Sequence, residues 1–166
     1  MKHPLVLLCS ALFIFFIAVA VFMYFFAPSP MRTVIVEIRG QSVTAELAET
    51  ILERTQGLSG RDSLDDDAGM LFLFDTLERH TMWMKGMKFP IDIVWIKNGK
   101  IIDIAEGAKP EPDVPGEFLT RYAPDIPAEL VLELPAGFIS RNEIMIGDEV
   151  SLVSGMLPSK YRAFLR

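Results

Sequence analysis

The sequence predicts a mainly β protein, a compact single-domain β-sandwich or barrel with one or two short helices, preceded by one N-terminal transmembrane helix. Three observations predict it: an uncharged apolar stretch at the N-terminus, short apolar runs separated by turn residues, and the dipeptide Asn98-Gly99 between two such runs. We divide the 166 residues into an anchor (1–27), a spacer (28–32), a β domain (33–154) and a C-terminal tail (155–166).

The N-terminal stretch from Leu5 to Ala27 contains no charged residue. As a helix it would span roughly 35 Å, enough for the hydrocarbon core of a bilayer, so it predicts a membrane anchor. A cleaved signal peptide is the alternative, because Ala18-Val19-Ala20 has the small-residue pattern of a cleavage site. The apolar stretch continues beyond Ala20, which favours the uncleaved anchor.

Charge predicts where the domain lies and which partners it lacks. Lys2 precedes the anchor, so we expect a short cytoplasmic N-terminus and an extracytoplasmic C-terminal domain, on the periplasmic side of a bacterial inner membrane. The lone Cys9 lies inside the anchor and leaves the domain without a thiol. A net charge of −6 and a pI near 4.9 disfavour nucleic acid as a partner.

The first part of the domain predicts a hairpin and a short helix. Residues 33–38 and 42–47 alternate apolar and polar side chains around Arg39-Gly40-Gln41, which indicates two strands with one buried face. Thr50 is expected to cap a helix, with Glu53 completing a capping box and Gly57 ending it.

The rest of the domain predicts mostly strands. Asn98-Gly99 is typical of a two-residue type I′ hairpin between residues 91–97 and 100–105. Residues 107–127 hold five of the eleven prolines and predict a long surface loop. The remaining predicted elements are strands at 69–74 (buried on both faces), 80–85, 128–134 and 149–153, and a helical turn at 136–142.

Several spaced motifs together resemble one family. They are Glu53-Arg54-x-x-Gly57-Leu58-x-x-Arg61, Leu64, Gly69-Met-Leu-Phe-x-Phe74, Trp83-Met84-Lys85, Pro90-Ile-Asp92-Ile and Leu132-Glu133-Leu-x-Ala136-Gly137. In this order they resemble the domain of unknown function family 192 (DUF192) over residues 42–153. The resemblance implies a small β-rich domain, often exported or membrane-anchored, without an assigned reaction. The chain departs from the family pattern at Ser59-Gly60 and at Gly86-Met87.

Six residues form a candidate ligand pocket: Arg61, Trp83, Lys85, Asp92, Trp95 and Glu133. Asp92 shares its strand with apolar neighbours, so its carboxylate should have a partner such as Arg61 or Lys85. That pairing would be a recognition site for a substrate anion or an internal salt bridge, and we favour the salt bridge. The two tryptophans would stack on a flat ligand, or pack in the core as tryptophans in strands more often do.

A soft-metal site is a further alternative. His80, Met82, Met84 and Met87 offer an imidazole and thioethers, which suit Cu(I), although methionine is also the ordinary gap-filler of apolar cores. The acidic run Asp65-Asp66-Asp67 lacks the pattern of a calcium loop and predicts a solvated turn. We therefore expect no cofactor.

The sequence contains no complete catalytic constellation, and the catalytic residues stay unknown. No serine has the context of an activated nucleophile, and a carboxylate pair such as Asp92 with Glu133 could support glycosidase-type hydrolysis. We expect a binding or accessory module of the cell envelope, with envelope carbohydrate or a protein as partner. The alternatives are a hydrolase acting on envelope carbohydrate and a copper-binding protein.

Overall fold

The computed structural model describes residues 12–19, 21, 23 and 31–165. The chain forms two units, residues 1–30 and residues 31–166. Residues 12–19 are helical, and no helix among the described residues combines the length and apolarity needed to cross a bilayer. Much of the predicted anchor, and the 28–30 part of the spacer, lie outside the described residues, so the anchor stays a prediction.

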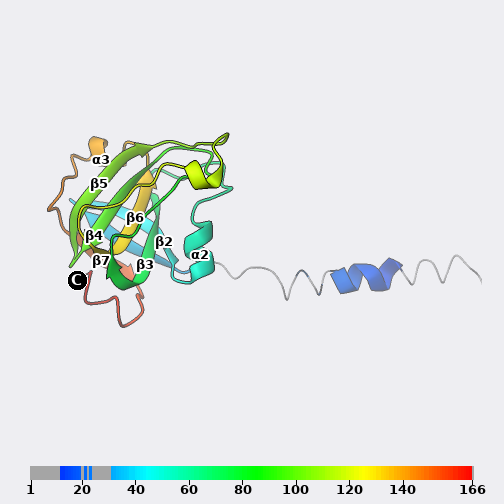
Figure 1. Ribbon diagram of the computed structural model, residues 1–166. Helices are drawn as coiled ribbons and strands as arrows, with labels where there is room; N and C mark the ends of the chain where they lie inside the picture. Colours follow the sequence, from blue (N-terminus) through cyan, green and yellow to red (C-terminus); the bar gives the residue numbers. More distant parts are fainter. Residues whose placement is uncertain (1–11, 20, 22, 24–30, 166) are drawn as a thin grey trace, which may run out of the picture. The chain divides into compact units, whose positions relative to one another are not determined.

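The domain is built on one mixed sheet of seven strands, in the order β5-β4-β6-β3-β2-β1-β7 (Figure 1). A single sheet replaces the predicted alternative of two stacked sheets. Only β2 and β3 are parallel neighbours. The strands are β1 Thr33–Ile38, β2 Gln41–Ala48, β3 Ala68–Glu78, β4 Ile91–Lys97, β5 Lys100–Ala108, β6 Ala128–Pro135 and β7 Val150–Gly155.

The sheet curls until its two edge strands meet at one end. The amide of Val150 at the start of β7 donates to the carbonyl of Gly99 at 2.8 Å, and Ile101 of β5 donates to the carbonyl of Asp148 at 2.9 Å. The concave face carries a large apolar cluster to which all seven strands contribute. The C-terminal tail adds Leu157, Tyr161 and Leu165 to this cluster.

Both predicted hairpins are confirmed. Asn98 and Gly99 have φ values of 50° and 72°, the left-handed pair that a type I′ turn needs, and β4 pairs with β5 on either side. Arg39 and Gly40 have φ values of 50° and 76° between β1 and β2. Positive φ costs glycine little, so these dipeptides fix the register of their strands.

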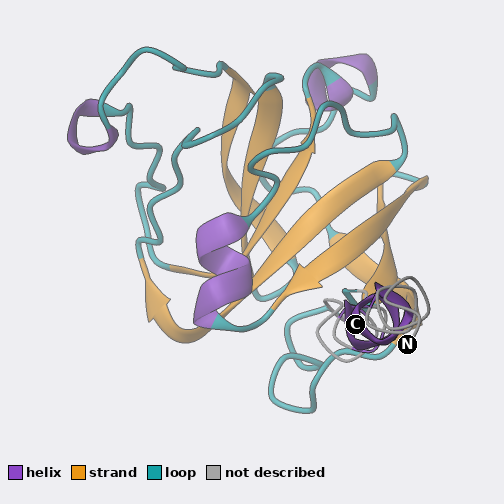
Figure 2. Cartoon of the chain, turned by 90° about the vertical axis from the view of Figure 1, so that its right-hand side faces the viewer, coloured by secondary structure: helices purple, strands orange, loops and turns teal. Residues whose placement is uncertain are grey.

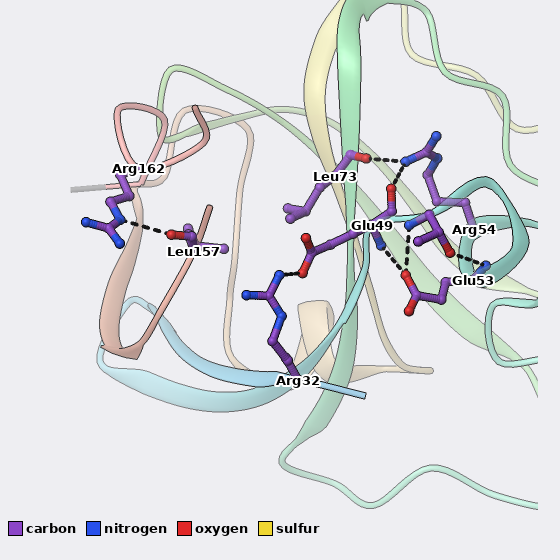
Figure 3. Close-up of polar contacts among 8 residues, drawn as sticks. Arg32, Glu49, Glu53, Arg54, Leu73, Leu157 and Arg162 are labelled. Carbon is purple, nitrogen blue, oxygen red and sulfur yellow. Dashed lines mark hydrogen bonds and ion pairs between the residues drawn. The ribbon is translucent and has the colours of Figure 1, made fainter. Parts of the chain in front are cut away.

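The helix α2 (Ile51–Gln56) begins with the predicted capping box. The Thr50 hydroxyl accepts from the Glu53 amide at 3.2 Å, and the Glu53 carboxylate accepts from the Thr50 amide at 2.7 Å. Arg54 then holds the helix to the sheet, because its guanidinium donates to the carbonyls of Glu49 and Leu73 (Figure 3). As a result α2 lies across the outer face of the sheet, in front of the strands in Figure 2.

One segment differs from its prediction. Residues 80–85 do not form a strand: only Met82 makes a ladder bridge, to Tyr122, with Met82 N donating to Tyr122 O at 2.7 Å. The segment 79–90 is instead an irregular connection between β3 and β4, and the Met82–Tyr122 bridge joins it to the long loop 109–127. That loop contains the 3-10 turn η1 (Gly116–Phe118), and the helical turn near the C-terminus is α3 (Phe138–Arg141).

The predicted salt bridge of Asp92 is wrong. Asp92 is fully buried in β4, but its two carboxylate oxygens accept backbone N–H groups, from Gly107 at 2.8 Å and from Ile139 in α3 at 3.0 Å. Arg61 pairs with Glu46 instead, through two hydrogen bonds of 2.6 and 2.8 Å. Backbone amides can satisfy a buried carboxylate as completely as a cation does, and Asp92 joins three segments of the fold in this way.

Candidate functional site

The convex face of the sheet carries a second apolar cluster, and a pocket of about 190 Å³ opens beside it. The pocket lies between α2 with the turn that follows it, the outer face of β3 and the irregular segment 79–90. Its lining residues come from these elements and from one position of β6: Ile51, Arg54, Thr55, Gln56, Gly57, Leu58, Ser59, Phe72, Phe74, Thr81, Met82, Trp83, Lys85, Met87 and Glu133.

Glu133 is the buried acid of this pocket. The residue is 4% exposed, and its side chain makes no hydrogen bond or ion pair with any other residue from 31 to 165. Among residues 31–165, every polar side-chain atom that is completely buried has a hydrogen-bond partner. Because the Glu133 carboxyl has no partner, its oxygens are not completely enclosed, and they open onto the pocket that Glu133 lines. Burial raises the pKa of the Glu133 carboxyl from 4.5 to about 8, because the charged form is poorly solvated there.

The strand register explains why Glu133 faces the pocket. Glu133 pairs with Ile93 of β4 and with Met70 of β3, and both belong to the convex cluster. Its neighbours Leu132 and Leu134 point into the concave cluster. Asp92 pairs with Leu134 and therefore lies on the opposite face of the sheet from Glu133. The two carboxylates do not converge, which removes the suggested hydrolytic pair.

The exposed Lys85 and the half-buried Trp83 mark the mouth of the pocket, and Arg121, which does not line the pocket, lies over the Trp83 ring. Trp83 is half-buried, and its ring lies 5.5 Å from the Lys85 ammonium and 4.1 Å from the Arg121 guanidinium. Lys85 is exposed and makes no ion pair with the described residues. The mouth is thus aromatic and positively charged.

The structure brings together three of the six predicted pocket residues, namely Trp83, Lys85 and Glu133. It places the other three elsewhere. Trp95 is 1% exposed, with its indole N–H bonded to the His80 carbonyl at 2.9 Å, so it is a core residue. Asp92 and Arg61 have the structural partners described above.

Several pocket residues were missed by sequence reasoning. Arg54, Phe72 and Phe74 were treated as parts of a helix and a strand, with no role at a site. The family motifs around Arg54 and Gly57 were a usable signal, since the pocket lies where the end of α2 meets β3. The aromatic ring of Phe72 comes within 3.3 Å of a side-chain carbon built on Gly57, so the glycine permits this close approach.

The three methionines of the copper alternative, Met82, Met84 and Met87, are all buried in the convex cluster, and Met82 and Met87 also line the pocket. His80 stacks on Phe74 with ring centroids 3.6 Å apart, and its Nε2 lies 2.8 Å from the Thr76 carbonyl oxygen. Among the described residues, no group of three or more histidine, cysteine or acidic side chains could hold a metal ion.

The two departures from the family pattern contact each other at the rim of the pocket. Gly60 N donates to Gly86 O at 2.9 Å, and a Cβ atom on Gly86 would lie only 2.2 Å from the Ser59 hydroxyl oxygen. Gly86 also has a φ of 68°. The backbone at this rim therefore depends on both Ser59-Gly60 and Gly86.

Comparisons with known proteins agree with this fold. A structure from Sinorhizobium meliloti 1021, described as a candidate transcription regulator, is 30% identical with a TM-score of 0.68, over 76% of this chain and 98% of that one. A protein of unknown function from Novosphingobium aromaticivorans DSM 12444 is also 30% identical, with a TM-score of 0.68, over 75% of this chain and 89% of that one. No curated protein matches significantly. The model of DUF192, described as "Uncharacterized ACR", matches residues 34–152, and the chain belongs to this family.

Proposed function

We propose that this protein is a membrane-anchored binding module of the bacterial cell envelope, and that its extracytoplasmic domain takes a small ligand into the pocket below α2. The observation that carries the proposal is Glu133, a buried carboxyl group that opens onto the pocket and has no partner among residues 31–165. Such a group costs stability unless something else bonds to it. A ligand would supply that bond.

The dimensions of the pocket favour a small molecule. Its volume of about 190 Å³ is below the range of roughly 300–1,000 Å³ that is usual for drug-sized ligands. A carbohydrate or protein partner of the envelope would therefore insert one residue or one end group. Glu133 is the only carboxylate among the residues that line the pocket, so the arrangement gives no support to a glycosidase with two acids.

The anchor and the charge support the proposed location. The uncharged segment 5–27 is long enough to span a bilayer, and it precedes a domain without cysteine. From residue 31 onward there are 15 basic and 22 acidic residues, a net charge of −7. This surface does not favour nucleic acid, whatever the role of the S. meliloti relative. A fusion of alkaline phosphatase to the C-terminus should be active, and an inactive fusion would contradict the location.

A thermal-shift screen tests the binding function. The full-length chain in mild detergent is screened against small acids, amines, neutral alcohols and amides, sugars and short peptides. A ligand at a hundred times its Kd should add about 2.7 kcal/mol of stability, a shift of several degrees. The Glu129→Gln variant is the matched control, because Glu129 lies on the same strand outside the pocket and should leave the shift unchanged. No shift with any compound class would refute the proposal.

A further inference from the structure

We propose that the pocket selects small organic acids whose apolar body carries a neutral polar group: Lys85 binds the ligand's carboxylate at the mouth, and Glu133 hydrogen-bonds the polar group at the floor. This inference rests on the proposed binding function and names the ligand class of the same site. It is carried by the positions and partners of the three charged side chains that line the pocket, Arg54, Lys85 and Glu133.

The charge of the mouth points to an anionic ligand group. Arg54 is already held by the Glu49 and Leu73 carbonyls, so Lys85 is the lining cation that makes no side-chain hydrogen bond or ion pair with the described residues. The guanidinium of Arg121, over Trp83, adds a second positive charge nearby. A carboxylate at this mouth would gain attraction, whereas an ammonium group would be repelled.

The floor requires a different group. Burial alone raises the pKa of Glu133 to about 8, so at neutral pH most molecules hold a neutral carboxyl group there. A neutral carboxyl both donates and accepts a hydrogen bond. The residues paired with Glu133 in the flanking strands are Met70 and Ile93, which have no charge. An alcohol, amide or carbonyl suits this environment, because it adds no charge to a poorly solvated position.

The walls between floor and mouth combine apolar side chains with the polar residues Thr55, Gln56, Ser59 and Thr81. Phe72, Phe74, Met82 and Met87 line the pocket together with the half-buried ring of Trp83. Aromatic and thioether groups pack well against a flat or branched hydrocarbon body. The expected ligand is therefore compact, with one apolar body between its two polar ends.

Matched probes with one scaffold separate these requirements. They are para-(hydroxymethyl)benzoate, the corresponding benzamide and benzylamine, and para-methylbenzoate, which lacks the alcohol. Binding to the full-length chain in detergent is measured by calorimetry and by tryptophan fluorescence, near neutral pH. We expect the hydroxymethyl acid to bind more tightly than the other three. Tighter binding of the amine, or equal binding of the two acids, would overturn the inference.

The pH dependence tests the state of Glu133. Ionisation of Glu133 should weaken binding of the hydroxymethyl acid by about thirtyfold at about pH 9.5, relative to about pH 6. Glu133→Gln keeps a donor and an acceptor, so it should bind the acid without this pH dependence. Glu133→Leu has no polar group at this position, so it should bind para-(hydroxymethyl)benzoate and para-methylbenzoate equally. Each variant tests the role of Glu133 separately, so one of them suffices if the other folds poorly. Affinity that rises with pH in the wild type would contradict the proposal.

Lys85→Gln tests the mouth. This variant should bind the hydroxymethyl acid about fivefold more weakly and bind the benzamide with unchanged affinity, as expected for the loss of a partly exposed ion pair. Lys88→Gln is the control, since Lys88 pairs with Asp62 and does not line the pocket. Binding of other compounds in the screen, but of neither acid, would overturn this inference and leave the proposed function standing. Binding of no compound would overturn both.

Discussion

Replacing Glu133 with glutamine should stabilise the protein, by an amount that grows with pH. Folding raises the pKa of this carboxyl from 4.5 to about 8, so the folded state holds a proton that the unfolded state releases. A raised carboxyl pKa means that stability is highest below pH 4.5 and is lost as the pH rises toward 8. The shift of about 3.5 pKa units corresponds to about 5 kcal/mol at 1.36 kcal/mol per unit.

The expected difference between Glu133→Gln and the wild type can be worked out at each pH. Linkage gives about 1 kcal/mol at about pH 5, about 3 kcal/mol at about pH 7 and about 5 kcal/mol at about pH 9. Urea unfolding of the full-length chains in detergent measures it. A difference that is constant over this range, or that shrinks as the pH rises, would refute the reasoning.

A second carboxylate provides a control of opposite sign. Hydrogen bonds from Arg61 hold the pKa of Glu46 below its ordinary value. Its contribution to stability is therefore present above the unfolded pKa and lost on acidification. Glu46→Gln should destabilise the protein at neutral pH, and this cost should disappear in acid. The two variants together separate the specific effect of Glu133 from any general effect of pH on the domain.

Five further substitutions test the structural assignments by urea unfolding. Asp92→Asn should cost about 1–3 kcal/mol, because an amide can accept from only one of the two backbone N–H groups that the carboxylate now binds. Gly86→Ala should cost about 1–3 kcal/mol of stability. Adding Ser59→Gly removes the clash with the Ser59 hydroxyl but not the positive φ, so it should restore only part of that stability. Full recovery would contradict the role given to the backbone of Gly86. Trp95→Phe should cost about 1–3 kcal/mol and Trp83→Phe much less, whereas equal costs would contradict their different burial.

Local chemistry made the turns and the helix start predictable. Asn98-Gly99 and Arg39-Gly40 both adopt positive φ values. The dipeptide Asn98-Gly99 was a sufficient signal for its hairpin, whereas the first hairpin was predicted from the alternating strands around Arg39-Gly40-Gln41. The capping box of Thr50 and Glu53 likewise involves atoms only three residues apart. Such features need no knowledge of the rest of the fold.

The sheet order and the site depended on contacts between distant segments. The segment 80–85 has the apolar pattern of a strand, but it meets the 109–127 loop and the convex cluster instead of a ladder partner. The need of Asp92 for a partner was foreseen, although sequence does not reveal that two amides from other segments reach it. From the sequence a cation is the obvious partner for a buried carboxylate, because nearly every residue has a backbone N–H and the sequence does not show which of them will donate.

Glu133 shows why a buried acid at a site is difficult to recognise and informative once it is placed. Every residue of β6 is buried, so the strand pattern does not distinguish the pocket face from the closed core. A leucine at this position would avoid the cost of burying a carboxyl, and most positions of β6 are already apolar. A buried polar group normally has a hydrogen-bond partner in the fold, and exceptions to such rules are expected at functional sites. Asp92 and Glu133 are both buried acids, but only Asp92 is accounted for by the fold, and this contrast is the strongest argument that Glu133 serves a ligand.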